Sequence, residues 1–353
     1  MLSRIADSLY WIGRYVERAE DTARITDIAY HNTLGLGSSA DAADRRRNHW
    51  EALVRITGDP LAFAATFREA SEDTVPLYLT FDTTNPNSIV SCVARAREQA
   101  RGLRHQIASE MWEVLNRFHL DLQRQRTWQG TWVGAENAHL FYRNVKEFSH
   151  LFQGVADSTM PRDEGWSFLQ AGKFLERATK TARALDVKYH LLMAESDDSA
   201  GKAIPLELPQ WQAMLRSFSA YESYHKLYRT AVRPRSVVEL IVLSAVFPRS
   251  IRFSIEQVDD ALARISAAGA FDAEGGAGEA ILPTGPFARG TDEAARLAGR
   301  LRSRLAFGTI DEVIAMGVST FLQDVQQRCY QIGERIHAQY FAPRILHAEE
   351  VVA

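Results

Sequence analysis

The sequence predicts an all-α fold: a duplicated helical bundle with pseudo-twofold symmetry and two related helices at its centre. Good helix formers fill residues 2–34 and 162–204, and neither stretch contains a proline. The segment GRYVERAEDTARITDIAYH at 13–31 has a second copy, GKFLERATKTARALDVKYH, at 172–190. Between 9–31 and 168–190, 10 of 23 aligned positions are identical, whereas chance gives about one or two. We therefore interpret the chain as an internal duplication.

The duplication divides the chain into a first repeat at 1–157 and a second at 158–353. His49 to Ile56 also resembles Gln210 to Ser217, with a shared tryptophan, so the repeat extends beyond its central helix. We expect the two repeats to pack as one unit, because a shared central seam needs both helices.

Composition restricts the possible classes of protein. The 353 residues are 46% hydrophobic and 24% charged, which is typical of a soluble globular protein. The net charge of −3 argues against a dedicated nucleic-acid binder. Cys92 and Cys329 form no CxxC motif, so neither a disulfide framework nor a thiolate metal site is indicated. Charges interrupt the apolar amino terminus, which predicts no signal peptide or membrane span, and a cytoplasmic location is expected.

The residues shared by the two central segments lie on one side of each predicted helix, because they are spaced by four, seven, three and four positions. They are Gly13, Glu17, Arg24, Asp27 and His31 in the first copy, and Gly172, Glu176, Arg183, Asp186 and His190 in the second. Positions that differ between the copies are expected to be exposed. Examples are Glu20 and Asp21, which align with Thr179 and Lys180.

Two interpretations of this shared stripe are open. In the structural one, the helices cross where Gly13 and Gly172 permit close approach, and buried ion pairs join Glu17 to Arg183 and Glu176 to Arg24. In the functional one, the stripes line a pocket in which the same charged residues bind a ligand. His31 and His190 could then act as general bases, each oriented by the aspartate four residues before it.

Further helices are expected in both repeats. The stretch at 88–126 reads as one long or gently broken helix, with Ser88 as a possible cap at its start and Pro86 just before it. Pro248 and Ser250 occupy the equivalent places in the second repeat. Residues 131–156 and 311–341 are expected to form the closing helices. The Gly- and Pro-rich segment 267–291 is predicted to be a mobile loop.

Three arginines of the stretch 88–126 could bind an anion. Arg97, Arg101 and Arg104 share one face of the predicted helix at positions i, i+4 and i+7. The simpler interpretation is that they are solvated or paired with acids.

A di-metal carboxylate site is a lesser alternative. Glu147 and His150, and Glu222 and His225, each form a Glu-x-x-His motif, and Glu17 and Glu176 would complete the set used by di-iron helical bundles. About 0.6 such motifs are expected by accident from ordinary composition, and the two motifs lie at non-equivalent repeat positions. No phosphate loop, HExxH, GxSxG or GxGxxG signature is present, and no cofactor is expected.

The segments YVERAEDTAR, FLERATKTAR, NPNSIVSCVARAREQARGLRHQIASEMWEVLN and FPRSIRFS together resemble the alpha-E domain family, a bacterial all-helical family that typically occurs as a tandem duplication. The resemblance covers essentially the whole chain. It places the family's ER motif on Glu17 and Arg18, and on Glu176 and Arg177. It places the arginine-rich helix on the stretch that contains Arg97, Arg101 and Arg104. The chain departs from the family at His105, where an acid is expected.

The resemblance implies a role rather than a reaction. Family members are associated with circularly permuted ATP-grasp ligases and transglutaminase-like proteins, which implies a peptide synthesis or modification system. We expect an accessory or scaffold component that docks with such partners. The alternative is an enzyme of the same pathway that binds an anionic or peptidyl substrate between the two central helices, through Glu17, Arg24, Glu176 and Arg183.

Overall fold

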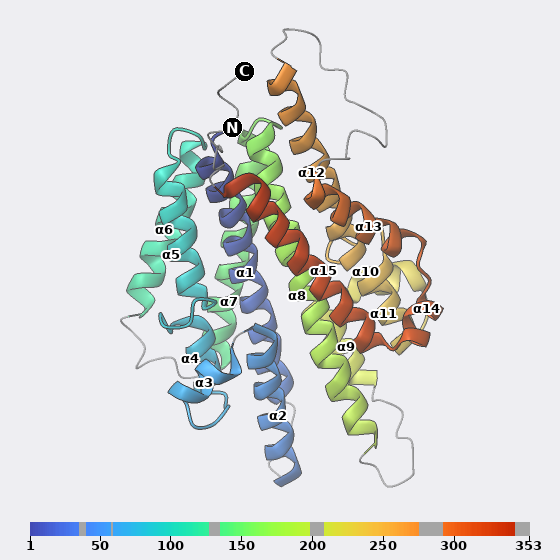
Figure 1. The fold of residues 1–353 in the computed structure, drawn as a ribbon. Helices are drawn as coiled ribbons and strands as arrows, with labels where there is room; N and C mark the ends of the chain where they lie inside the picture. Colours follow the sequence, from blue (N-terminus) through green and yellow to red (C-terminus); the bar gives the residue numbers. More distant parts are fainter. Residues whose placement is uncertain (35–39, 58, 127–134, 198–207, 275–291, 343–353) are drawn as a thin grey trace.

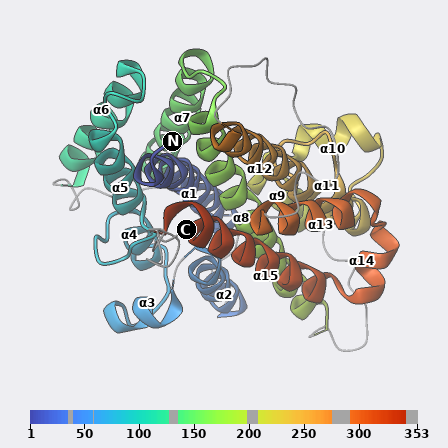
Figure 2. The ribbon, with the colours of Figure 1, turned by 45° about the horizontal axis from the view of Figure 1, so that its top comes forward.

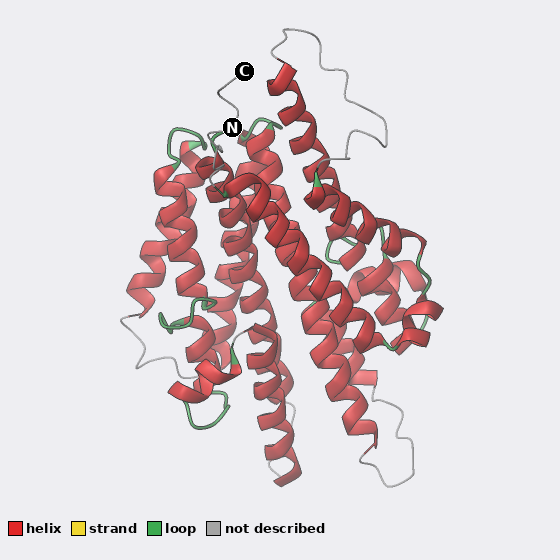
Figure 3. Ribbon diagram, in the orientation of Figure 1, coloured by secondary structure: helices red, strands yellow, loops and turns green. Residues whose placement is uncertain are grey.

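The computed structural model describes residues 1–34, 40–57, 59–126, 135–197, 208–274 and 292–342. Within these ranges the chain consists of helices and loops without a strand (Figures 1 and 3), which confirms the all-α prediction. The helices of the first half are α1 (Ser3–Leu34), α2 (Ala40–Thr57), α3 (Pro60–Thr66), α4 (Thr74–Thr80), α5 (Ile89–Gly102), α6 (Ser109–Arg126) and α7 (Ala135–Thr159). Those of the second half are α8 (Glu164–Asp197), α9 (Leu208–Ser217), α10 (Tyr221–Tyr228), α11 (Pro234–Leu243), α12 (Ile251–Glu274), α13 (Glu293–Phe307), α14 (Ile310–Met316), α15 (Val318–Ile336) and the π-helical turn η2 (His337–Phe341).

The two helices predicted to be central, α1 and α8, pack against each other in the middle of the molecule. Their first turns lie side by side, and the amino terminus of Met1 is 2.9 Å from the carboxylate of Glu164. The two helices run in the same direction (Figure 1). A Cβ on Gly13 would lie 2.3 Å from the carbonyl oxygen of Leu169, and one on Gly172 would lie 2.0 Å from that of Tyr10. Glycine is therefore required at both positions for this close crossing.

The neighbours of α1 and α8 are arranged alike. In the first half, α1 contacts α5 and α7, and α6 packs between these two helices. In the second half, α8 contacts α12 and α15, and α13 packs between them. In addition, α2 packs on α8 and α9 packs on α1, so each half supplies a helix to the central helix of the other. The pseudo-twofold symmetry of the whole bundle stays a prediction.

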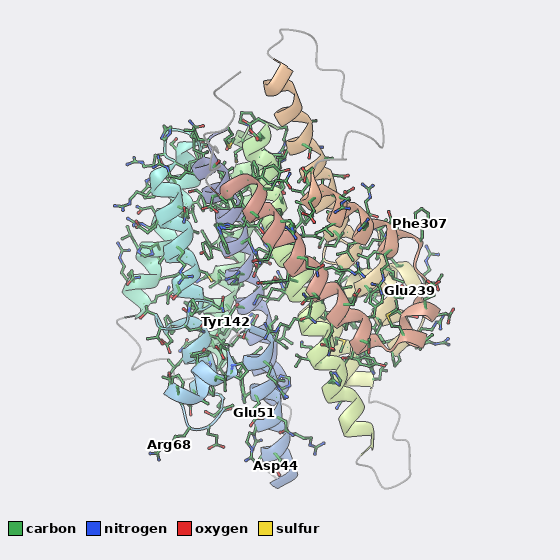
Figure 4. The ribbon with its side chains drawn as sticks, viewed as in Figure 1. Asp44, Glu51, Arg68, Tyr142, Glu239 and Phe307 are labelled. Atoms are coloured by element: carbon green, nitrogen blue, oxygen red, sulfur yellow. The ribbon has the colours of Figure 1, made fainter. Side chains whose placement is uncertain are left out.

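The core continues through both halves. The aligned tryptophans Trp50 and Trp211 are both buried, at 1% exposure. Tyr142 lies within the first half, and its hydroxyl is 3.0 Å from that of Thr80 (Figure 4). Phe307, by contrast, is 86% exposed at the outer edge of the second half. No helix in the described ranges is both long enough and apolar enough to cross a membrane.

Two predicted long helices are interrupted. Residues 88–126 form two helices, because α5 ends at Gly102 and the turn before α6 is anchored by buried Leu103 and Ile107. Residues 311–341 also divide into two helices and η2. Gly317 has φ +87°, a conformation that glycine adopts without strain, and it separates α14 from α15. Of the segment 267–291, residues up to 274 belong to α12, and 275–291 lie outside the described residues.

Candidate functional site

Two bidentate carboxylate–guanidinium pairs join α1 and α8 at their crossing. Arg177 donates to both oxygens of Glu17, from Nε at 2.5 Å and from Nη2 at 2.8 Å. Arg18 donates to both oxygens of Glu176 in the same way, at 2.7 and 3.0 Å. Both glutamates are buried, at 0% and 1% exposure. Burial of an ionised carboxylate is costly unless the charge is paired and hydrogen-bonded, and here each repeat supplies the arginine that pairs with the glutamate of the other.

The predicted pairs of Glu17 with Arg183 and of Glu176 with Arg24 are wrong. Because α1 and α8 are parallel and cross at their glycines, Glu17 lies level with Arg177. Arg183 is seven residues farther along α8 than Glu176, which corresponds to about 10 Å of helix. Arg24 instead bonds to Glu20, one turn away on its own helix, and to Ser219 beyond α9.

The two pairs face different surroundings. On the side that we call the Glu17 side, Arg177 donates to the carbonyl oxygen of Pro248 at 3.2 Å, just before α12, and Gln153 of α7 donates to Glu17 at 3.2 Å. On the Glu176 side, Arg18 donates to the side-chain oxygen of Asn87 at 2.8 Å, just before α5. Each motif arginine therefore reaches the start of one neighbouring helix.

Glu176 has a second arginine partner. Nε of Arg14 lies 2.7 Å from the Oε2 atom that Arg18 also contacts. Burial would raise the pKa of Glu176, but Arg18 and Arg14 together hold it far below the usual range of a glutamate. This carboxylate is therefore ionised at neutral pH.

On the Glu17 side, a further buried acid, Glu20, contacts three basic side chains. Glu20 is fully buried and bonds to Arg249 and to Arg24, and Nε2 of His150 lies 3.3 Å from its Oε1 atom. Burial opposes ionisation of Glu20, but Arg249, His150 and Arg24 hold its pKa well below normal. Its second oxygen and Nε of Arg24 have no hydrogen-bond partner within the described ranges. The cluster is thus ionised yet incompletely satisfied.

The neighbouring Asp21 behaves differently. Its Oδ1 atom accepts from Nη1 of Arg249 at 3.1 Å, whereas its buried Oδ2 atom has no hydrogen-bond partner among the described residues. Burial and the nearby charges of Glu17 and Glu20 raise the pKa of Asp21 to about 7, against the attraction of Arg249. An aspartate in this state can gain or lose a proton near neutral pH, as a general acid or base must.

Two lysines of α8 flank the pairs. Burial lowers the pKa of Lys173 and of Lys180 to about 8 in each case, and nearby arginines add to the effect. Lys173 borders a small cavity of about 10 Å³ on the Glu17 side, together with Gly13, Phe152 and Gln153. This volume is close to the minimum that holds one water molecule.

The other residues of the shared stripe do not join these pairs. Asp27 accepts from Lys146 at 2.7 Å and lies 2.8 Å from Nδ1 of His139, both on α7. Asp186 accepts from the hydroxyl of Ser319 at 2.6 Å, and Nε2 of His190 lies 2.7 Å from that hydroxyl. The serine therefore lies between acid and histidine, which differs from the Ser-His-Asp order of a catalytic triad. The side chain of His31 lies outside the described residues.

The three arginines considered for an anion site are separated by the end of α5. Arg97 and Arg101 both contact Glu98, at 2.7 and 2.8 Å. Arg104 lies beyond the end of this helix. Its guanidinium group lies 5.2 Å from the ring centre of Trp112, and that of Arg97 lies 5.3 Å from the same ring. These arginines are paired with an acid and an aromatic ring, which favours the simpler interpretation.

The residues considered for a di-metal site are also dispersed. Glu147 lies 3.5 Å from Arg143, and His150 faces Glu20, while Glu222 and His225 belong to α10, which lies away from α7 (Figures 1 and 2). In the part of the chain that the structure describes, no three His, Cys, Asp or Glu side chains are grouped so that they could hold a metal ion.

Sequence reasoning missed Glu20, Asp21, Lys180 and Arg249. The first three were expected to be exposed because the copies differ there, but they are 0%, 8% and 9% exposed. The signal that could have found them is the exchange of two acids for a threonine and a lysine directly beside an unchanged ion-pair motif. The tripeptide before Ile251 likewise introduces Arg249 where the first repeat has Asn87.

Residues 1–341 match the Alpha-E family, described as a predicted alpha-helical domain with a conserved ER motif. Uncharacterised proteins of Mycobacterium bovis and Mycobacterium tuberculosis are each 26% identical to the chain over 266 residues, which are 72% of this chain and 29% of theirs. The chain therefore matches less than a third of the length of these relatives. No solved structure matches. The match over nearly the whole chain, together with its helical fold, shows that the chain belongs to the Alpha-E family.

Proposed function

We propose that this protein is a non-catalytic accessory or scaffold component of a bacterial peptide synthesis or modification system. Its partners in the cytoplasm would be a circularly permuted ATP-grasp ligase and a transglutaminase-like protein, as the family resemblance implies. The observation that carries the non-catalytic part is the reciprocal pairing of the motif residues. Glu17 and Glu176 already accept two hydrogen bonds each from Arg177 and Arg18, so their charges hold the repeats together.

The lengths of the relatives support a role beside other protein segments. In the mycobacterial proteins, the matching region is 29% of the chain, so the rest of each relative accompanies it covalently. A stable helical module that is joined to other segments in one protein can act through association with separate chains in another. Similarity of this kind supports a partnership without identifying a reaction.

The test is recovery of partners from the native bacterium with the tagged protein, followed by mass spectrometry. We expect the wild-type protein to recover an ATP-grasp ligase. The Glu17→Gln variant should lose the partner only in proportion to its unfolded fraction, measured by circular dichroism in the same buffer. Glu147→Gln, at an exposed glutamate, is the matched control. Failure of the folded wild-type protein to recover a ligase or a transglutaminase-like protein would overturn the proposal.

One observation favours the second candidate, an enzyme of the same pathway. Asp21 combines burial, a pKa of about 7 and an oxygen without a hydrogen-bond partner among the described residues. The enzyme hypothesis requires the Asp21→Asn variant to lose product formation in a reconstituted mixture with the recovered partners while it remains folded. Unchanged product formation would exclude Asp21 as the acid or base.

A further inference from the structure

The Glu17 side and the Glu176 side differ in charge at equivalent positions. On the Glu17 side, Glu20 and Asp21 hold the guanidinium of Arg249 between them. On the Glu176 side the aligned residues are Thr179, Lys180 and Asn87, respectively. Two acids and a base have thus been replaced by a hydroxyl, a base and a neutral amide.

This exchange leaves two basic groups on the Glu176 side, Lys180 and Arg183, without a carboxylate that pairs with them. Lys180 is nine-tenths buried and forms no hydrogen bond or ion pair with a described residue. Its ammonium lies within electrostatic range of Glu176, Arg18 and Arg183. Glu176 already pairs with Arg18 and Arg14, so its single negative charge is shared among three cations.

Arg183 also lacks a carboxylate partner among the described residues. Its counterpart Arg24 is paired with Glu20, but the residue that corresponds to Glu20 is Thr179, whose hydroxyl donates to the carbonyl oxygen of Leu175 at 2.8 Å. Arg183 therefore has no acid one turn before it, and it forms no ion pair within the described ranges. Arg18, Asn87 and Arg183 are each half-buried, so this place lies at the edge of the bundle, where solvent can reach it.

We propose that the Glu176 side is a binding site for a small oxyanion, a phosphate or carboxylate group, held by Lys180 and Arg183 with Arg18 and Asn87 beside them. The anion supplies the negative charge that Glu20 and Asp21 supply on the opposite side. Buried unpaired cations are costly, and an oxyanion with two or more acceptor oxygens satisfies several donors at once. This site goes beyond the proposed function and does not depend on it, because it requires neither a partner protein nor a reaction.

The first experiment measures binding of inorganic phosphate by calorimetry at pH 7.5 and constant ionic strength, with acetate and chloride as separate arms. We expect phosphate, acetate or both to bind the wild-type protein, whereas chloride does not. The Lys180→Met variant should bind at least about tenfold more weakly, the usual loss for a buried charged donor. Lys173→Met is the matched control, because Lys173 lies on the Glu17 side of the same helix and has a similar pKa. Equal binding by the Lys180→Met variant, or no binding of either oxyanion by the wild type, would overturn the proposal.

A second variant keeps the proposal testable if Lys180→Met fails to fold. Thr179→Glu restores the acid that the first repeat has at Glu20 and should pair with Arg183. We expect this variant to fold, to be at least as stable as the wild type in phosphate-free buffer, and to lose most of its phosphate binding. Full binding by a folded Thr179→Glu protein would contradict the site.

Proton uptake is an independent readout. The charged or titratable groups that face Lys180 are Glu176 and Arg183 on α8, Arg18 on α1 and Cys92 on α5. A bound anion favours the protonated lysine, so phosphate binding at pH 8.5 should take up a proton, visible as a dependence of the heat on the buffer. The Lys180→Met variant should show no such uptake.

Discussion

Arg177 holds both carboxylate oxygens of Glu17, although 160 residues separate them in the sequence. Since Arg18 holds Glu176 in the same way, neither half of the chain can satisfy its own motif. The fold of each repeat is thereby tied to the presence of the other.

Removal of the Glu17 charge should destabilise the protein strongly. The Glu17→Gln variant leaves the buried Arg177 without its counter-charge. It also removes one of the carboxylates near Arg249. Breaking one partner of a buried pair costs about 3–5 kcal/mol, which can be measured as a lower free energy of unfolding in urea. Glu147→Gln, which changes a side chain that is 65% exposed, should change stability by less than about 0.5 kcal/mol.

The matched double variant tests whether this cost comes from the pair itself. Glu17→Met combined with Arg177→Met removes both charges, so it should be less destabilised than the sum of the two single variants by at least about 1 kcal/mol. Additive effects would show that the two side chains act independently, contrary to the geometry.

The close crossing of α1 and α8 should not tolerate a methyl group. Gly13→Ala and Gly172→Ala would each place a Cβ against a carbonyl oxygen, at 2.3 and 2.0 Å, so the helices must separate. We expect a loss of about 3 kcal/mol or more in thermal or urea unfolding. Gly154→Ala in α7 is the control, because no atom lies within 4 Å of the new methyl group. It should be neutral or stabilising by up to about 1 kcal/mol.

Asp21 should make stability depend on pH near neutrality. Its pKa is about 7 in the folded protein and about 3.8 when unperturbed, so the folded state binds the proton more tightly. The stability that this proton contributes is fully present below the unfolded value and is lost as the pH rises through 7. The Asp21→Asn variant should therefore exceed the wild type by about 2–4 kcal/mol at pH 8 but differ little at pH 4. Urea titrations of both proteins at pH 4 and pH 8 measure this difference in the free energy of unfolding. An equal difference at the two pH values would contradict the prediction.

The two cysteines should be inert in the folded protein. Cys92 and Cys329 are both buried free thiols, and burial raises the pKa to about 11 and about 12, respectively. At pH 8 the thiolate fraction is then below about one in a thousand. A chromogenic disulfide reagent should detect almost no thiol in the native protein and both thiols after denaturation. Rapid labelling of either cysteine without unfolding would contradict the burial.

The helices could be predicted from the sequence because proline spacing, caps and apolar periodicity act locally. The capping serines Ser88 and Ser250 begin α5 and α12 as expected, and the glycines of the central helices permit the crossing. A break within 88–126 was left open, and it occurs at Gly102, whereas the break at Gly317 was missed. Glycine within a helical pattern does not by itself say whether a helix ends there.

The partners across the crossing could not be predicted in the same way. Helical periodicity places Glu17 and Arg24 on one face but does not say which residue of α8 lies level with them. That depends on where the two backbones touch and on their relative direction. Difference between the copies was likewise an unreliable guide to exposure, since Glu20 and Lys180 differ from their counterparts and are nevertheless buried.

The opposite charges of Asp21 and Lys180, which align between the two repeats, also indicate when in the evolution of the gene this difference arose. A single ancestral repeat would need a second copy of itself to satisfy its glutamate and arginine, and so would exist as a homodimer. In a homodimer, every substitution appears on both sides of the axis, so an acid on one side and a base on the other cannot arise. The difference must therefore have followed the duplication of the gene, because only two separate copies allow each side to evolve independently.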